Sequence, residues 1–252
     1  MVKISAAPIA LLCVSLLGCH STAPLLTASA PHVTSQDVAS PPKYVPEGTD
    51  WTAVVGVPPA PGSVELANDV ASLEWCQRTR NPMTVSEAWA GVDVSVACFQ
   101  SELNANVKHG SFPELYATVA TVMAQCMVVA HKVKDQFKRP RPFLTHDELH
   151  PILPKPSSYS FPSGHATRGM LTYVLLADLF PENKEALEAR GRQIGDLRAA
   201  AGMHYPSDVE AGQRLGLALG EAVLTTDAWK QARAQLAGAV KKIRASRGSK
   251  SE

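Results

Sequence analysis

The chain has 252 residues, of which 45% are hydrophobic, 19% charged and 6% aromatic. These proportions describe one ordinary globular core and exclude a disordered chain, a collagen and a small disulfide-rich protein. Lys and Arg total 24 against 23 for Asp and Glu, so the chain lacks the basic excess of a nucleic-acid-binding domain. Any anion that the protein binds must therefore meet a local cluster of cations.

The first residues are organised like an export signal. An apolar stretch too short to span a bilayer follows Lys3, and Leu16-Leu17-Gly18-Cys19 resembles a bacterial lipobox. We therefore expect residues 1–18 to be removed as a lipoprotein signal peptide, with Cys19 lipidated and the protein held in the cell envelope, in the periplasm or at the outer membrane. The alternative is cleavage after Ala28-Ser29-Ala30, which would release a soluble protein.

The rest of the chain divides by composition. Residues 19–58 are rich in Pro, Ser, Thr and Ala and predict a tether. Residues 59–246 form the expected domain, and residues 247–252 a polar tail. No uninterrupted apolar stretch after the leader reaches the ~20 residues of a membrane helix, so we expect an exported soluble domain that meets a membrane only through its lipid. Three cysteines of the domain allow one disulfide without specifying the pair: Cys76, Cys98 and Cys126.

Apolar residues of the domain recur at helical spacing, and strand alternation is scarce. Capping-box patterns at Thr84–Glu87, Ser111–Glu114 and Ser207–Glu210 mark helix starts. The sequence therefore predicts an all-α, single-domain bundle of about six or seven helices. The expected ranges are 63–79, 84–106, 112–138, 164–180, 182–203, 207–223 and 227–246.

Three segments concentrate the polar chemistry. In the first, a long helix carrying Lys134 runs into the prolines that flank Arg141, so the chain can fold back and aim both cations at one point. The structural alternative for this basic run is a solvated helix end.

The second segment is Pro162-Ser163-Gly164-His165, a turn that leads directly into an apolar helix. The free backbone N–H groups at such a helix start favour an anion, and Gly164 lets the anion approach closely. The alternative is that Ser163 only caps the helix.

The third segment places Arg198 at the end of one helix, His204 after it and Asp208 in the first turn of the next. Asp208 is close enough to accept the Nδ1 proton of His204, which would leave Nε2 as a nucleophile. Asp208 also suits the dipole of its helix.

The order Lys-x6-Arg-Pro, Pro-Ser-Gly-His and Arg-x5-His-x3-Asp resembles the three-part signature of the type-2 phosphatidic acid phosphatase and vanadium haloperoxidase superfamily. Further likeness to the class A bacterial nonspecific acid phosphatases lies in Pro58–Ser63 followed by Asp69, in Arg139–Phe143 and in Glu188–Gly191. The resemblance implies a metal-independent acid phosphatase that acts on small-molecule phosphate monoesters without a cofactor.

The resemblance also implies residue roles. His204 would attack phosphorus and become phosphohistidine, Asp208 would orient it, and His165 would protonate the leaving group and then activate water. The phosphoryl oxygens would be bound by five residues: Lys134, Arg141, Ser163, Gly164 and Arg198. The family usually has Ser before the last Arg of the signature, and this chain has Leu197 at that position. Because Leu197 cannot donate a hydrogen bond, we expect fewer supporting contacts around Arg198.

Alternatives remain open. The same site could serve a lipid-phosphate phosphatase or, with vanadate in place of phosphate, a haloperoxidase. His146-Asp147-Glu148-Leu149-His150 imitates a zinc helix, but Asp replaces the usual Glu and prolines confine the segment to eight residues. A non-enzymatic, anion-binding envelope lipoprotein would keep the cations but has no use for His204 paired with Asp208.

Overall fold

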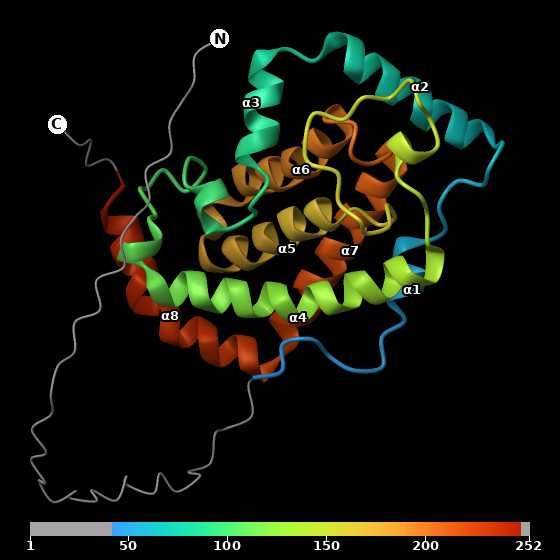
Figure 1. Cartoon of the computed structure of the whole chain (residues 1–252). Coiled ribbons are helices and arrows are strands. Elements are labelled where there is room, and N and C mark those ends of the chain that lie inside the picture. The colour runs from blue at the N-terminus through green and yellow to red at the C-terminus, as the bar shows by residue number, and fades with distance from the viewer. Residues whose placement is uncertain (1–41, 248–252) are drawn as a thin grey trace, which may run out of the picture. The chain divides into compact units, whose positions relative to one another are not determined.

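A computed structural model describes residues 42–247, and in this range it has eight α-helices, four short 3-10 helices and no strand (Figure 1). The all-α fold class predicted from the sequence is confirmed. The signal peptide, Cys19 and residues 248–252 lie outside the described residues. The α-helices are α1 (Trp51–Val55), α2 (Val64–Thr79), α3 (Pro82–Ala90), α4 (Pro113–Phe137), α5 (Gly164–Leu179), α6 (Lys184–Ala200), α7 (Pro206–Thr225) and α8 (Asp227–Ala245).

Helix α5 is the centre of the fold. Eleven of its 16 residues are buried, because the helix is apolar on nearly every side and packs against α4, α6 and α7. In Figure 1 it lies between α4 and α6, with α7 beside it. The buried surroundings of α5 hold its N-terminus in a fixed place, which matters because that end carries the Pro-Ser-Gly-His segment.

Glycines let α5 approach its neighbours closely. A Cβ atom on Gly212 of α7 would lie 2.4 Å from the carbonyl oxygen of Ser163, and one on Gly191 of α6 would lie 2.9 Å from that of Gly169. Since atoms in ordinary van der Waals contact are about 3.5 Å apart, no larger residue fits at these contacts without displacing a helix. The two glycines therefore fix the spacing between α5 and the helices beside it.

Helix α4 crosses α5 and presents nine buried residues to the fold. The stretch Pro113–Leu144 also has the length and composition of a membrane-spanning helix, with a mean hydropathy of 1.3 and 44% of that window buried inside the fold. The stretch meets these criteria by its average hydropathy, although Thr and Gln residues interrupt its apolar run. A core helix of a globular domain satisfies the same criteria.

The chain before residue 59, assigned to the tether, packs on the domain from Tyr44 onward. Tyr44 is buried and its N–H donates to Oε1 of Gln125 at 2.9 Å, while Asp50 caps the short helix α1. Val55 is fully buried and its carbonyl accepts from Arg214 of α7 at 2.7 Å. The end of this segment is therefore a strap across α4 and α7.

The predicted helix over residues 84–106 is wrong in extent. Asn81 caps α3 instead of Thr84, with Pro82 in the first turn, and the helix ends at Gly91. The chain then continues through the 3-10 helix Val96–Phe99. Similarly, the start of α7 is capped at Tyr205, whose N–H donates to Oδ2 of Asp208 at 2.9 Å, two residues before the expected box.

The cysteines of the described chain form no disulfide. Cys76 and Cys98 are half-buried free thiols, and Cys126 lies in the core, where burial raises its pKa to about 12. The single disulfide that the sequence allows is not formed in this structure.

Candidate active site

The three predicted segments meet around one cavity with a volume of 290 Å³. Its polar wall comes from the end of α4, the start of α5 and the α6–α7 turn, and the loop before α5 closes another side with Leu153, Pro154, Pro156 and Ser158. Six of the predicted site residues line the cavity: Lys134, Arg141, Gly164, His165, Arg198 and His204.

Two local structures bring these segments together. Lys138 ends α4 in the left-handed conformation, with φ of 48°, and turns the chain back so that Arg141 faces the cavity. Gly202, with φ of 74°, ends α6, and the N–H of Met203 donates to the carbonyl of Arg198 at 2.9 Å. This second turn fixes His204 relative to Arg198.

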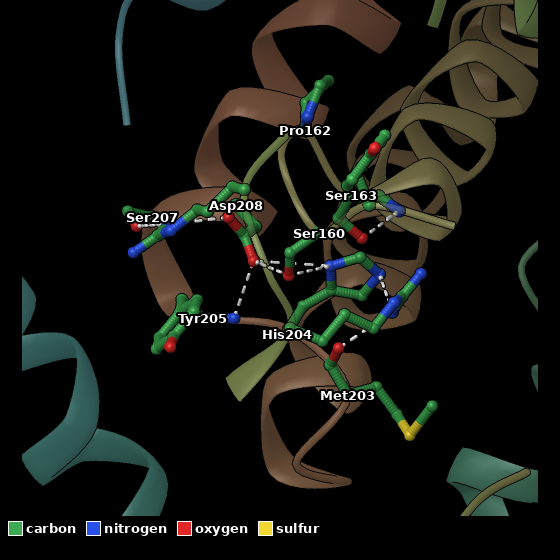
Figure 2. Close-up of polar contacts among 12 residues, drawn as sticks. Ser160, Pro162, Ser163, Met203, His204, Tyr205, Ser207 and Asp208 are labelled. Atoms are coloured by element: carbon green, nitrogen blue, oxygen red, sulfur yellow. Dashed lines mark hydrogen bonds and ion pairs between the residues drawn. The ribbon is translucent and has the colours of Figure 1, made fainter. Parts of the chain in front are cut away.

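Asp208 and His204 form a fully buried pair at the start of α7 (Figure 2). Oδ2 of Asp208 lies 3.5 Å from Nδ1 of His204 and accepts hydrogen bonds from the Ser160 hydroxyl at 2.5 Å and the Tyr205 N–H at 2.9 Å. Burial opposes ionisation of Asp208, but hydrogen bonds and the nearby cation Arg139 together lower its pKa. Asp208 is therefore a carboxylate that orients the imidazole.

The other nitrogen of His204, Nε2, faces Arg141. Nη1 of Arg141 lies 3.0 Å from it, and because a guanidinium can only donate, Nε2 is the acceptor and Nδ1 carries the proton. Burial is the main reason that the pKa of His204 falls to about 3, and the charges of Arg141 and Lys134 lower it further. The ring is thus neutral in mildly acidic solution, with a lone pair on the nitrogen that faces the cavity.

Backbone carbonyls hold the cations of the cavity. Nζ of Lys134 donates to three of them, the shortest at 2.5 Å from Pro162, and Arg141 donates to those of Ser158 and Met203 at 2.9 Å. Burial, with the charge of Arg141, lowers the pKa of Lys134 to about 7, and burial lowers the pKa of Arg141 to about 10. These side chains are fixed in place before any ligand arrives.

Several N–H groups at the cavity have no protein acceptor within the described residues. Arg198 donates through Nη2 to the carbonyl of Ala88, but its Nε is buried without a partner. The backbone N–H groups of Gly164 and His165, at the start of α5, likewise have none. A buried donor without an acceptor is costly, and helix starts attract anions. The arrangement therefore suits an anion with several oxygens.

His165 also lines the cavity and is half-buried. Its Nε2 lies 3.0 Å from the carbonyl of Val92, so this nitrogen donates and carries a proton. Burial and then the charge of Arg198 are the largest causes that lower the pKa of His165 to about 4. The imidazole can exchange a proton with a bound molecule in the acidic range.

Two predicted site residues, Asp208 and Ser163, do not line the cavity. Ser163 is fully buried and caps α5 by accepting from the N–H of Ala166 at 3.4 Å, while its own N–H donates to the carbonyl of Asp208 at 2.8 Å. Its side chain therefore follows the capping alternative. Leu197, which replaces the usual Ser, is buried and gives Arg198 no hydrogen bond. His146 and His150 lie in irregular chain on either side of a turn, so they do not share the helical face that a zinc helix needs.

The site contains a supporting ion pair that sequence reasoning left out of the site. Arg139 donates to Asp208 at 2.7 Å and to Asp69 of α2 at 3.1 Å, and its guanidinium lies 3.9 Å from the ring centre of Tyr205. Asp69 also accepts from the hydroxyl and the N–H of Ser207. Asp69 and Arg139 belong to the quoted likeness with the class A phosphatases, so the sequence held a signal for both.

Sequence reasoning also missed two residues without such a signal. Ser160 precedes the Pro-Ser-Gly-His motif and bonds Asp208, and its Oγ lies 3.4 Å from Nδ1 of His204. Arg168 lies one helical turn after His165 and lines the cavity as a fourth cation. Neither belongs to the three-part signature.

Comparison with known proteins agrees with this geometry. Residues 115–232 match the PAP2 superfamily. The chain is 27% identical over 180 residues to a non-specific acid phosphatase of Providencia stuartii, covering 66% of this chain and 71% of the relative. It is 30% identical over 141 residues to a non-specific acid phosphatase of Salmonella typhimurium, covering 52% and 56%.

A lipid A 1-phosphatase of Rhizobium etli is 36% identical over 93 residues, 35% of this chain and 40% of that protein. The chain thus spans less than two thirds of the Salmonella and Rhizobium relatives. Among solved structures, the first transmembrane PAP2 type phosphatidylglycerolphosphate phosphatase from Bacillus subtilis shares the fold, with a TM-score of 0.50 and 19% identity over 69% of this chain and 89% of that one.

Proposed function

We propose that this protein, whose residues 115–232 match the PAP2 superfamily, is an acid phosphatase that hydrolyses phosphate monoesters through a phosphohistidine on His204. The observation that carries the proposal is the buried, unpartnered Nε of Arg198 in a cavity that is also lined by three further cationic side chains and a neutral, oriented histidine. A phosphoryl group supplies the missing acceptor, and His204 supplies the nucleophile.

In the first step, Lys134, Arg141 and Arg198 bind the nonbridging phosphoryl oxygens together with the free N–H groups of Gly164 and His165. Nε2 of His204 attacks phosphorus as the bond to the ester oxygen breaks, and Arg141 moves its hydrogen bond from Nε2 to a phosphoryl oxygen. His165 gives its proton to the leaving oxygen. The ring of His204 then carries a positive charge, which the Asp208 carboxylate stabilises.

In the second step, His165 takes a proton from water as the water oxygen attacks phosphorus and the bond to Nε2 breaks. Inorganic phosphate leaves, His204 is neutral again, and His165 regains the proton it donated. Ser163 contributes as the cap of α5, and Asp208 acts through His204. Fixed cations neutralise the phosphoryl group, and on this basis we propose that turnover needs no metal ion.

Hydrolysis of p-nitrophenyl phosphate by the purified full chain tests the function. We expect turnover that EDTA leaves unchanged and that vanadate inhibits competitively. The His204→Ala variant should be inactive, whereas His109→Ala, a change at an exposed histidine that is not part of the cavity wall, serves as the matched control. Activity lost in EDTA and restored by zinc would contradict the mechanism, and absence of turnover would contradict the function.

A lipid phosphate is a second candidate substrate, because the cavity wall contains apolar side chains beside its cations. These include Met127, Leu153 and Met203. Rates measured under the same detergent conditions on a short alkyl phosphate and on its long-chain analogue would distinguish the two substrate classes. A strong preference for the long chain would favour the lipid-phosphate phosphatase.

For location, we propose attachment to the cell envelope through Cys19. The Cys19→Ser variant should lose lipid labelling and recovery with the membrane fraction. A wild-type protein that is free in solution and begins near Pro31 would instead favour cleavage after Ala30.

A further inference from the structure

Arg168 differs from the other cations of the cavity in having no partner. Lys134, Arg141 and Arg198 each donate to backbone carbonyls. Arg168 is half-buried in the same wall, yet its guanidinium makes no hydrogen bond and no ion pair with any described residue. A guanidinium offers five N–H donors in a rigid plane and is well suited to bind an anion in two places.

The charge of the cavity points the same way. Four cationic side chains line it, and no Asp or Glu of the described chain is part of its wall. Asp208 lies behind His204 and is paired with Arg139. A phosphate monoester brings at most two negative charges, so the wall holds more positive charge than the reacting group can neutralise.

The position of Arg168 on α5 indicates which end of the substrate this side chain faces. Residues three apart on a helix lie on the same side, one turn apart, so Arg168 neighbours His165. In the proposed mechanism His165 protonates the leaving oxygen, and Arg168 therefore lies beside the leaving group. Its charge contributes to the lowered pKa values of His165 and Lys134, which agrees with this closeness.

We propose that Arg168 binds a second anionic group, a carboxylate or a further phosphate, on the alcohol part of the substrate. This inference rests on the proposed function and narrows its substrate class to phosphate monoesters whose leaving group is itself acidic. Asp93 is the acidic neighbour that acts electrostatically on Arg168. It is exposed, so it weakens the attraction without occupying the guanidinium.

Two matched substrate series test the proposal on the full chain. The first pairs phosphorylated hydroxy acids of increasing chain length with their methyl esters, and the second pairs alkanediol bisphosphates with alkyl monophosphates of the same length. The readout is the ratio of kcat/KM within a pair, because effects common to both members cancel. We expect a ratio of about 10 to 100 at the best length, the range of a charge-assisted hydrogen bond.

The Arg168→Gln variant should bring the ratio close to one, Arg168→Lys should keep part of it, and Asp93→Asn should raise it. The series that gives the larger ratio identifies a carboxylate or a phosphate as the second group. A wild-type ratio near one at every length, or a ratio that Arg168→Gln leaves unchanged, would overturn the inference. Both results require turnover of the uncharged member; if no substrate is hydrolysed, the proposed function itself fails.

Discussion

Replacing Gly212 of α7 by Ala should displace the start of α5 and so lower both stability and activity. The added Cβ would lie 2.4 Å from the carbonyl oxygen of Ser163 and 2.9 Å from Cβ of Ala166. Reaching ordinary contact near 3.5 Å requires a shift of about 1 Å, and this shift falls on Ser163 and Ala166, the residues on either side of Gly164 and His165. Overpacking of this kind costs roughly 1–3 kcal/mol of stability, and a displacement of about 1 Å can lower kcat/KM by about 100-fold.

The matched control is Gly238→Ala in α8, where an added Cβ meets nothing within 4 Å. Since Ala is the better helix former, this change should stabilise the protein by up to about 1 kcal/mol. Urea unfolding followed by circular dichroism gives both stabilities, and kcat/KM for p-nitrophenyl phosphate gives the activity per folded molecule. Wild-type stability and activity in Gly212→Ala would refute the conclusion that contact with α7 positions the start of α5.

Asp208→Asn should lower kcat by about 100- to 10,000-fold with little change in KM, because the imidazole loses its oriented tautomer; an unchanged kcat would remove Asp208 from the mechanism. Arg139→Met leaves two buried carboxylates unpaired and should lower the free energy of unfolding, measured in urea, by about 3–5 kcal/mol. Arg233→Met, at a more exposed ion pair, should lower it by less than about 1 kcal/mol. Equal losses of stability in the two variants would contradict this expectation. For an alkyl phosphate, kcat/KM should fall as pH rises above 4, because His165 of the free enzyme loses its proton there. For p-nitrophenyl phosphate, whose leaving group needs little protonation, kcat/KM should stay constant until Lys134 loses its proton near pH 7. Identical pH profiles for the two substrates would show that His165 is not the general acid.

The long helices could be predicted because their apolar stripes and flanking prolines are local signals. Helices α4, α5 and α8 begin and end within two residues of the expected ranges. The helix expected over 84–106 failed because Gly91 has a tertiary role. A Cβ atom on Gly91 would lie 3.2 Å from Nη2 of Arg198, which donates to the carbonyl of Ala88 in the last turn of the helix.

In the site, too, sequence motifs predicted some features, and others depend on tertiary contacts. The resemblance to the three-part signature implied one shared site for Lys134, His165 and His204, and all three residues line one cavity. The link from Asp69 to Arg139 spans 70 residues, and no local pattern specifies such a contact. The extent of burial around His204, which is the main cause of its low pKa, also depends on the assembled fold.

The central claim is that His204 carries the phosphoryl group, and trapping that intermediate tests it most directly. In the His165→Ala variant the second step should stall. When this variant is mixed with p-nitrophenyl phosphate labelled in its phosphoryl group and then quenched, the label should remain on the protein. We predict an adduct that is labile in acid and stable in base, on the peptide that contains His204. An acid-stable, base-labile adduct would mean a carboxylate nucleophile, and label on another peptide would equally contradict the account.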